Sequence, residues 1–118
     1  MYQEIPVYIL TIVGSQLNIN ESELIPETFA LHTNYPNPFN PTTTILYDLP
    51  KAATVYLVIY DVLGRQVRTL VNQDLTAGYH RAVWDATDDL GRPLSGGLYI
   101  YRIQAGGYSK TMKMVLLK

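Results

Sequence analysis

Short stretches of alternating apolar and polar residues make up most of the chain after residue 27, and turn-forming residues separate them. A period of two is typical of strands that bury one face. No helical periodicity persists over the length of a helix anywhere in the sequence. The pattern predicts strands over residues 28–31, 44–49, 55–60, 66–71, 79–84, 97–103 and 108–117.

About seven short strands, with turns every 8–12 residues or so, indicate an all-β chain folded as an immunoglobulin-like antiparallel β-sandwich. Residues 55–60 place apolar side chains on both faces of the predicted strand, which is typical of a central strand. The last two strands are expected to form a hairpin over residues 104–107. We find no internal repeat of useful period. The best candidates for the core are Trp84, Tyr99, Tyr101 and Ile103.

A proline-rich segment precedes the second predicted strand. It consists of Asn34, Tyr35, Pro36, Asn37, Pro38, Phe39, Asn40 and Pro41. Its prolines fix three φ angles and remove three backbone donors, which excludes a helix or the middle of a sheet. Each proline also favours extended geometry at the residue before it. We expect a stiff structural segment that Tyr35 and Phe39 pin to the core. The alternative, a ligand for a proline-binding groove, lacks an adjacent basic anchor.

The chain before this segment has a different character. Residues 6–13 are a β-rich apolar run, whereas residues 18–26 are polar, acidic and bounded by proline, as is typical of a linker. We therefore expect residues 1–14 to be a strand left from a preceding domain or an extra edge strand. Residues 15–26 are the expected acidic linker, and residues 27–118 the expected domain.

Composition narrows the possible functions. The 118 residues suit one domain with a short appendage, and the absence of cysteine excludes disulfides and cysteine metal ligands. The longest apolar run, from Val7 to Val13, is too short to span a bilayer. Residues 1–50 contain five acidic residues and no Lys or Arg. The charged residues after Asp89 are Arg92, Arg102, Lys110, Lys113 and Lys118.

This basic end of the chain has three possible interpretations: a recognition address, a nucleic-acid patch, or ordinary solvated strand faces that protect a sheet edge.

Candidate catalytic and metal-binding residues are few. His32 and His80 are the only histidines, and their spacing does not fit a zinc site. No serine lies in a nucleophile-elbow pattern. Asp85, Asp88 and Asp89 could ligate calcium, but their spacing does not fit an EF-hand, and hydrogen bonding within a turn is favoured. We expect no enzymatic activity, no cofactor and no metal.

Several motifs follow one another in an order that resembles a known family. They lie at residues 34–45, 58–67, 78–80, 84–85, 97–99 and 110–118. Together, over residues 27–118, they resemble the type A C-terminal sorting domains of the bacterial type IX secretion system. Within this region, residues 40 to about 106 are similar to the immunoglobulin-like domain of flagellar hook-capping proteins.

The resemblance implies a non-catalytic module that exports a larger secreted protein, whose passenger domain lies on the N-terminal side. Such domains fold in the periplasm and are recognised by the outer-membrane secretion machinery. A sortase-like peptidase often removes them as the passenger is attached to the cell surface. The implied location is therefore secreted or cell-surface, reached through the periplasm. The family's recognition features map onto Gly97, Tyr99, Lys110, Lys113 and Lys118.

Each of these residues also has a structural interpretation. Gly97 can relieve a tight turn, Tyr99 can be a core aromatic, and lysines on a terminal strand discourage edge-to-edge pairing.

Two other functions stay open. One is a carbohydrate- or surface-binding sandwich, which requires several aromatics in an exposed row, and the other is a structural domain that self-associates like the hook-capping proteins. We expect no nucleic-acid partner and no transmembrane segment.

Overall fold

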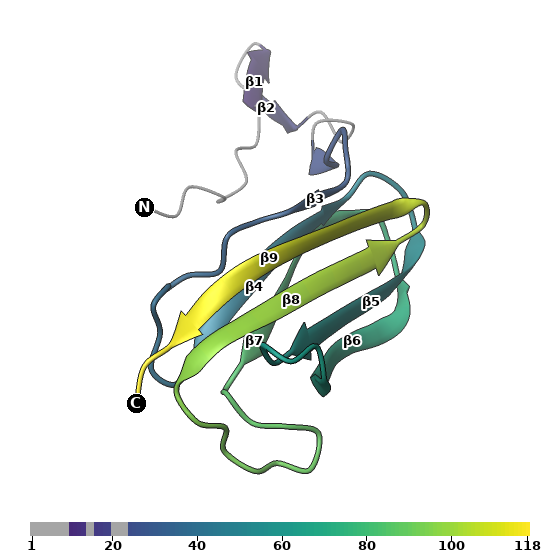
Figure 1. The fold of residues 1–118 in the computed structure, drawn as a ribbon. Coiled ribbons are helices and arrows are strands. Elements are labelled where there is room, and N and C mark those ends of the chain that lie inside the picture. Colours follow the sequence, from purple (N-terminus) through teal and green to yellow (C-terminus); the bar gives the residue numbers. More distant parts are fainter. Residues whose placement is uncertain (1–9, 14–15, 20–23) are drawn as a thin grey trace.

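The computed structural model describes residues 10–13, 16–19 and 24–118. Within these residues there are nine β-strands and no α-helix (Figure 1). Strands β1 (Leu10–Val13) and β2 (Gln16–Ile19) pair antiparallel as a separate two-stranded sheet. No helix in the described part of the chain is long and apolar enough to cross a membrane.

Seven strands form a two-layer sandwich. They are β3 (Ala30–Leu31), β4 (Thr43–Leu49), β5 (Ala53–Tyr60), β6 (Gln66–Leu75), β7 (Gly78–Trp84), β8 (Gly97–Ala105) and β9 (Tyr108–Leu116). One sheet has the order β3-β4-β7 and the other β6-β5-β8-β9, and all these neighbours pair antiparallel. The predicted all-β immunoglobulin-like sandwich of seven strands is confirmed.

Several strands differ in length from their predictions. β5 begins at Ala53 and β8 continues to Ala105, so the final hairpin turns over residues 106–107 and not over the predicted 104–107. β3 has only two residues, although residues 28–31 were expected to be extended. β6 continues to Leu75, four residues past the predicted end at Val71. Its added residues 72–74 are polar and exposed, so the alternation that marks a strand is lost there. Backbone pairing with β5 extends the strand instead.

The N-terminal predictions are only partly covered by the described residues. Residues 10–13 of the expected first strand form β1, whereas residues 6–9 lie outside the described residues. The expected linker, 15–26, contains β2. The domain boundaries at residues 14 and 26 stay predictions.

The core lies between the two sheets. All four predicted core residues are buried, with Trp84 and Tyr101 at 0%, Ile103 at 1% and Tyr99 at 6% exposure. Three consecutive residues of β5, 57–59, are also buried, so this strand is covered on both faces and its predicted central place is confirmed.

The proline-rich segment connects β3 to β4 and reaches the other sheet on the way. Its three X–Pro peptide bonds, before Pro36, Pro38 and Pro41, are cis. Tyr35 forms an isolated bridge with Thr44 of β4, but its side chain is 52% exposed, so the prediction that it pins the segment to the core is wrong, whereas the same prediction for Phe39, at 1% exposure, is confirmed. The segment is therefore neither helix nor regular strand, in agreement with its proline content.

Candidate functional site

The proline-rich segment and the end of β9 pair with each other. Phe39 forms a parallel bridge with Leu116: its N–H donates to Val115 O (3.0 Å), and its carbonyl accepts from Leu117 N–H (2.8 Å). Asn37 Oδ1 accepts a further hydrogen bond from Val115 N–H (3.0 Å). The segment thus takes the place of a neighbouring strand along the end of β9. We call this set of contacts the β9 clamp.

A cluster of aromatic rings anchors the β9 clamp in the core. The ring of Phe39, which is 1% exposed, lies 5.8 Å from that of Trp84, and Trp84 meets Tyr99 edge-on at 5.4 Å. Trp84 Nε1–H donates to Thr87 O (2.9 Å), and the Tyr99 hydroxyl donates to Ser95 O (2.6 Å). The polar groups of both buried rings, Trp84 and Tyr99, are therefore hydrogen-bonded. Three motifs that are distant in the sequence meet in this cluster.

A buried hydrogen-bond network fixes the start of the same segment. The Tyr101 hydroxyl donates to His32 O (2.8 Å) and accepts from Asn34 N–H (3.0 Å). Asn34 Nδ2 donates to Thr43 Oγ1 (3.0 Å), which in turn donates to Pro36 O (2.8 Å). Because these groups are buried or partly buried, the network holds the segment in one path.

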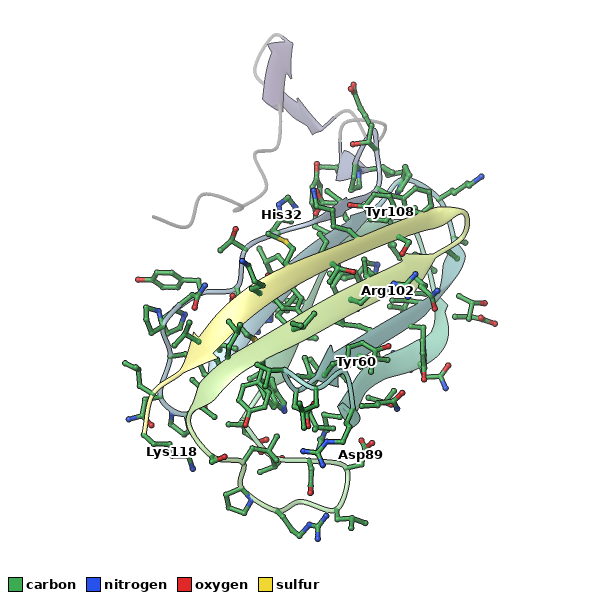
Figure 2. The ribbon with its side chains drawn as sticks, viewed as in Figure 1. His32, Tyr60, Asp89, Arg102, Tyr108 and Lys118 are labelled. Carbon is green, nitrogen blue, oxygen red and sulfur yellow. The ribbon has the colours of Figure 1, made fainter. Side chains whose placement is uncertain are left out.

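The five residues predicted for recognition lie on β8 and β9 but do not form one cluster. The strand register pairs Gly97 with Leu116, Tyr99 with Met114, Lys113 with Ile100 and Lys110 with Ile103. Lys118 follows β9 at the end of the chain (Figure 2). The three lysines are exposed, whereas Tyr99 is buried in the aromatic cluster. The lysines are therefore spread along the strand and reach solvent, and the tyrosine does not.

Two glycines at the start of β8 set its path beside the chain end. A Cβ on Gly96 would lie 3.1 Å from Leu116 O and 3.1 Å from Lys118 Cγ, a tight approach that favours glycine because any side chain would have to displace its neighbours slightly. Gly97 has open space around it but a φ of +150°, which disfavours other residues. Gly97 therefore has a structural reason to be glycine.

The two histidines make structural contacts. His32 Nε2 lies 2.8 Å from Asp48 Oδ2. His80 Nε2 lies 2.8 Å from Thr76 O, and its ring stacks on Tyr47 at 5.5 Å. Burial raises the pKa of the Tyr47 hydroxyl above its usual value. Among the described residues, no three His, Cys, Asp or Glu side chains gather in a group that could hold a metal ion.

One aspartate organises the loop between β5 and β6. Asp61 Oδ1 accepts from the N–H groups of Leu63 (2.9 Å) and Arg65 (3.0 Å), and Oδ2 accepts from Arg65 Nε (2.8 Å). Gly64 completes the turn with a φ of +82°. The backbone N–H of Arg65 is the main cause that holds the pKa of Asp61 below its usual value.

The loop between β7 and β8 contains the same turn. Asp88 Oδ1 accepts from Leu90 N–H (2.9 Å) and Arg92 N–H (2.9 Å), and Oδ2 accepts from Arg92 Nε (2.9 Å). Gly91 has a φ of +80°. The pKa of Asp88 is again lowered, mainly by the backbone N–H of Arg92. We call residues 61–65 and 88–92 the twin turns.

Side chains and backbone of β6 tie the second twin turn to the sandwich. Arg68 Nη1 donates to Asp88 O (2.8 Å), and Thr69 N–H donates to Asp89 Oδ1 (2.9 Å). Nearby, Asp85 Oδ1 accepts from Thr87 N–H (3.2 Å). Asp85 and Asp88 thus make the turn hydrogen bonds that the sequence favours, whereas the side chain of Asp89 bonds to β6 instead.

The twin turns and the start of β8 line a cleft of about 590 Å³. The three most exposed large apolar side chains of the described residues all line it: Leu90 (75%), Leu63 (74%) and Val62 (61%). The side chains of Arg65 and Arg92 are 73% and 71% exposed. Asp89, labelled in Figure 2, marks this end of the molecule.

Comparison with known families identifies the domain. Residues 38–109, more than half of the chain, match the FlgD Ig-like domain. The chain belongs to the FlgD Ig-like domain family. The predicted similarity to hook-capping proteins is confirmed, and the matched bounds lie close to the expected residues 40–106.

Solved structures resemble this FlgD Ig-like domain. Dimeric latent PorU from Porphyromonas gingivalis has a TM-score of 0.60 and 23% identity, over 72% of this chain and 9% of PorU. FlgD from P. aeruginosa has a TM-score of 0.51 and 22% identity, over 67% of each chain. PorZ, an essential surface component of the type IX secretion system of P. gingivalis, has a TM-score of 0.49 and 20% identity, over 78% of this chain and 12% of PorZ.

At these identities the likeness establishes the fold alone. This chain spans only a small part of PorU and of PorZ. No curated protein sequence matches it.

The family match covers some of the predicted recognition residues and leaves out others. Gly97, Tyr99 and both twin turns lie inside the matched region, whereas Lys110, Lys113 and Lys118 follow it. Gly97 and Tyr99 therefore lie within the part of the chain that matches the FlgD Ig-like domain, and the three lysines lie after the end of the match.

Sequence reasoning missed the twin turns as a pair. The signal was present, because the pattern Asp-x-Leu-Gly-Arg occurs at residues 61–65 and again at 88–92. Each copy reads as an ordinary turn when it is considered alone. Their closeness in space depends on the pairing of β5 with β8 and on the contacts from β6.

Proposed function

We propose that residues 27–118 are a sorting module that directs a larger protein to the type IX secretion machinery for export and cell-surface attachment. The main support is the ordered set of motifs that resembles type A sorting domains, several of which meet at the β9 clamp and its aromatic cluster. Membership of the FlgD Ig-like family supports a non-catalytic module. The proposed partners are the outer-membrane translocon, a sortase-like peptidase and an N-terminal passenger.

In this proposal the recognition residues have two different roles. Tyr99 is buried against Trp84, so it acts by holding the last strand in place and not by direct contact. Lys113 and Lys118 are exposed and supply the address that the secretion machinery reads. The β9 clamp contributes by fixing the backbone between these two lysines on both sides, through β8 and through the proline-rich segment.

The test is the export of a reporter protein fused to residues 15–118 in a host that has a type IX system. We expect the parent fusion to reach the cell surface and the combined Lys113→Ala and Lys118→Ala variant to lose most of its display. Lys51→Ala is the matched control, because Lys51 is an exposed lysine before β5. Tyr99→Phe tests the buried site, since it removes the hydroxyl but keeps the ring.

Folding of each fusion is checked by circular dichroism on the purified domain. Undiminished display of the folded double-lysine variant would show that these lysines are not the address. A parent fusion that is folded and yet never displayed would refute the sorting proposal and favour a binding or assembly module.

The carbohydrate-binding alternative gains little support from the tyrosines. It requires exposed aromatics in a row. Among the described residues, the exposed tyrosines are Tyr35 (52%) in the proline-rich segment and Tyr79 (39%) on β7. Tyr35 bridges Thr44, whereas Tyr79 lies opposite Asp48, so the two are separated along β4.

A further inference from the structure

We propose that the cleft between the twin turns is a docking site for an extended peptide segment of another protein, one that carries carboxylate side chains next to apolar ones. The cleft is separate from the lysines assigned to sorting, although Gly96 borders both the cleft and Lys118. This inference does not depend on the export function.

The guanidinium groups favour a carboxylate ligand. Within the described structure, Arg65 and Arg92 each donate to their own aspartate through Nε, and their terminal nitrogens donate to no protein group. The carboxylates of Asp61 and Asp88, in contrast, each already accept three hydrogen bonds. The site therefore offers charged donors. Arginine binds carboxylates through two parallel hydrogen bonds, which gives direction as well as charge.

The leucines favour a ligand that is partly apolar. Leu63 and Leu90 occupy the same position in the two turns, and they are more exposed than any other large apolar residue described. Val62 and Leu98 add to the apolar lining of the cleft. Exposed apolar side chains that gather around a cleft mark a binding surface, because a partner gains by covering them.

The site is also preorganised. Each turn is held by its aspartate and by a glycine with positive φ, and β6 fixes the second turn to the sheet. Binding would therefore order few additional groups in this protein. The cleft volume of about 590 Å³ lies within the usual range of ligand pockets.

A nucleic acid fits these features less well than a peptide. Its phosphates would pair with the two arginines but would leave both leucines in water. Asp61, Asp88 and Asp89 line the same cleft and repel any anion beside them, and the regularly spaced phosphates of a nucleic acid could not all avoid these carboxylates. An extended peptide can place separate carboxylates on the arginines and apolar side chains on the leucines.

The test is a fluorescence-anisotropy titration of the full chain with a fluorescein-labelled ten-residue peptide of alternating glutamate and leucine. We expect saturable binding. We also expect the combined Arg65→Gln and Arg92→Gln variant to bind about tenfold or more weakly, because hydrogen bonds to charged groups are lost. Leu63→Ser with Leu90→Ser should weaken binding similarly. The matched control, Arg81→Gln with Val83→Ser, changes exposed residues of β7 outside the cleft and should bind like the parent.

Several results would overturn the proposal: no saturable binding, equal binding of a peptide with glutamine in place of glutamate, or equal weakening by the β7 control. Displacement of the peptide by a single-stranded oligonucleotide of equal charge, at equal concentration, would show that the cleft recognises charge alone. If the double glutamine variant does not fold, Arg65→Lys with Arg92→Lys keeps the charge but loses the planar fork, and it should still bind more weakly than the parent.

Discussion

Phe39 joins parts of the chain that local sequence keeps apart. Its side chain packs on Trp84 in the core, while its backbone pairs with residues 115–117. The proline content predicts an irregular, extended segment, and the aromatic residue predicts an anchor. Trp84 lies 45 residues along the chain and the backbone partners at 115–117 more than seventy, so no local pattern identifies either.

We predict that Phe39→Ala lowers the free energy of unfolding by about 3–5 kcal/mol, the usual cost when a buried aromatic ring is removed. Urea unfolding followed by tryptophan fluorescence would measure it, since Trp84 is the only tryptophan and touches the ring. Tyr35→Ala is the control in the same segment, and with 52% exposure it should cost less than about 1 kcal/mol. Equal losses for the two variants would contradict the anchoring role of Phe39.

At the scale of elements, the twin turns illustrate how a five-residue pattern fixes a loop. In each turn the aspartate accepts backbone hydrogen bonds from the third and fifth residues, and the glycine adopts the left-handed conformation. These contacts are local, so each turn is encoded by its own residues. What the pattern does not encode is that the two turns face one cleft.

We predict that Gly64→Ala and Gly91→Ala each reduce stability by about 1–2 kcal/mol, because a side chain disfavours the left-handed conformation. Neither position is crowded, since a Cβ there would have no neighbour within 4 Å. Thermal unfolding would measure the loss. Gly107→Ala, equally uncrowded but without a positive φ, is the control and should change stability by less than about 0.5 kcal/mol. A similar loss at all three glycines would argue against backbone strain as the cause.

The sequence predicts most of the sandwich because alternation records burial, and burial decides where β4, β5 and β8 lie. The prediction from alternation is wrong where an interaction other than burial determines the structure. The end of β6 is held by backbone pairing at residues 72–74, which are polar on both faces. The candidate sites could not be predicted from the sequence for a related reason. Tyr99 is predicted correctly as a core residue, but the β9 clamp and the cleft arise from contacts between distant segments.

At the scale of the whole molecule, the two ends of the sandwich differ. The loops of the twin turns, the β9 clamp and Lys118 lie toward one end, and the β8–β9 hairpin lies at the other (Figure 1). Both candidate sites are therefore on the side away from β3, where the chain enters the domain.

The aspartates of the twin turns should make the fold less stable at low pH. The pKa values of Asp61 and Asp88 are lowered in the folded state, mainly by backbone N–H groups. The stability that these carboxylates confer is complete above the unfolded aspartate pKa of about 3.9 and is lost as the pH falls below it. We predict that the melting temperature of the parent drops more steeply below about pH 4 than that of Asp61→Asn with Asp88→Asn. Parallel curves for the two proteins would exclude this contribution.

The parallel pairing of Phe39 with Leu116 also determines how the domain carries tension. A pull on the chain before β3 and after β9 draws the two paired segments in opposite directions along their own axes. Their hydrogen bonds at Val115 and Leu117, together with that from Val115 to Asn37, then share the load in shear instead of opening one after another. A domain pulled from both ends would resist in shear at this pairing, once the load has passed the contacts of β3 and Tyr35 with β4.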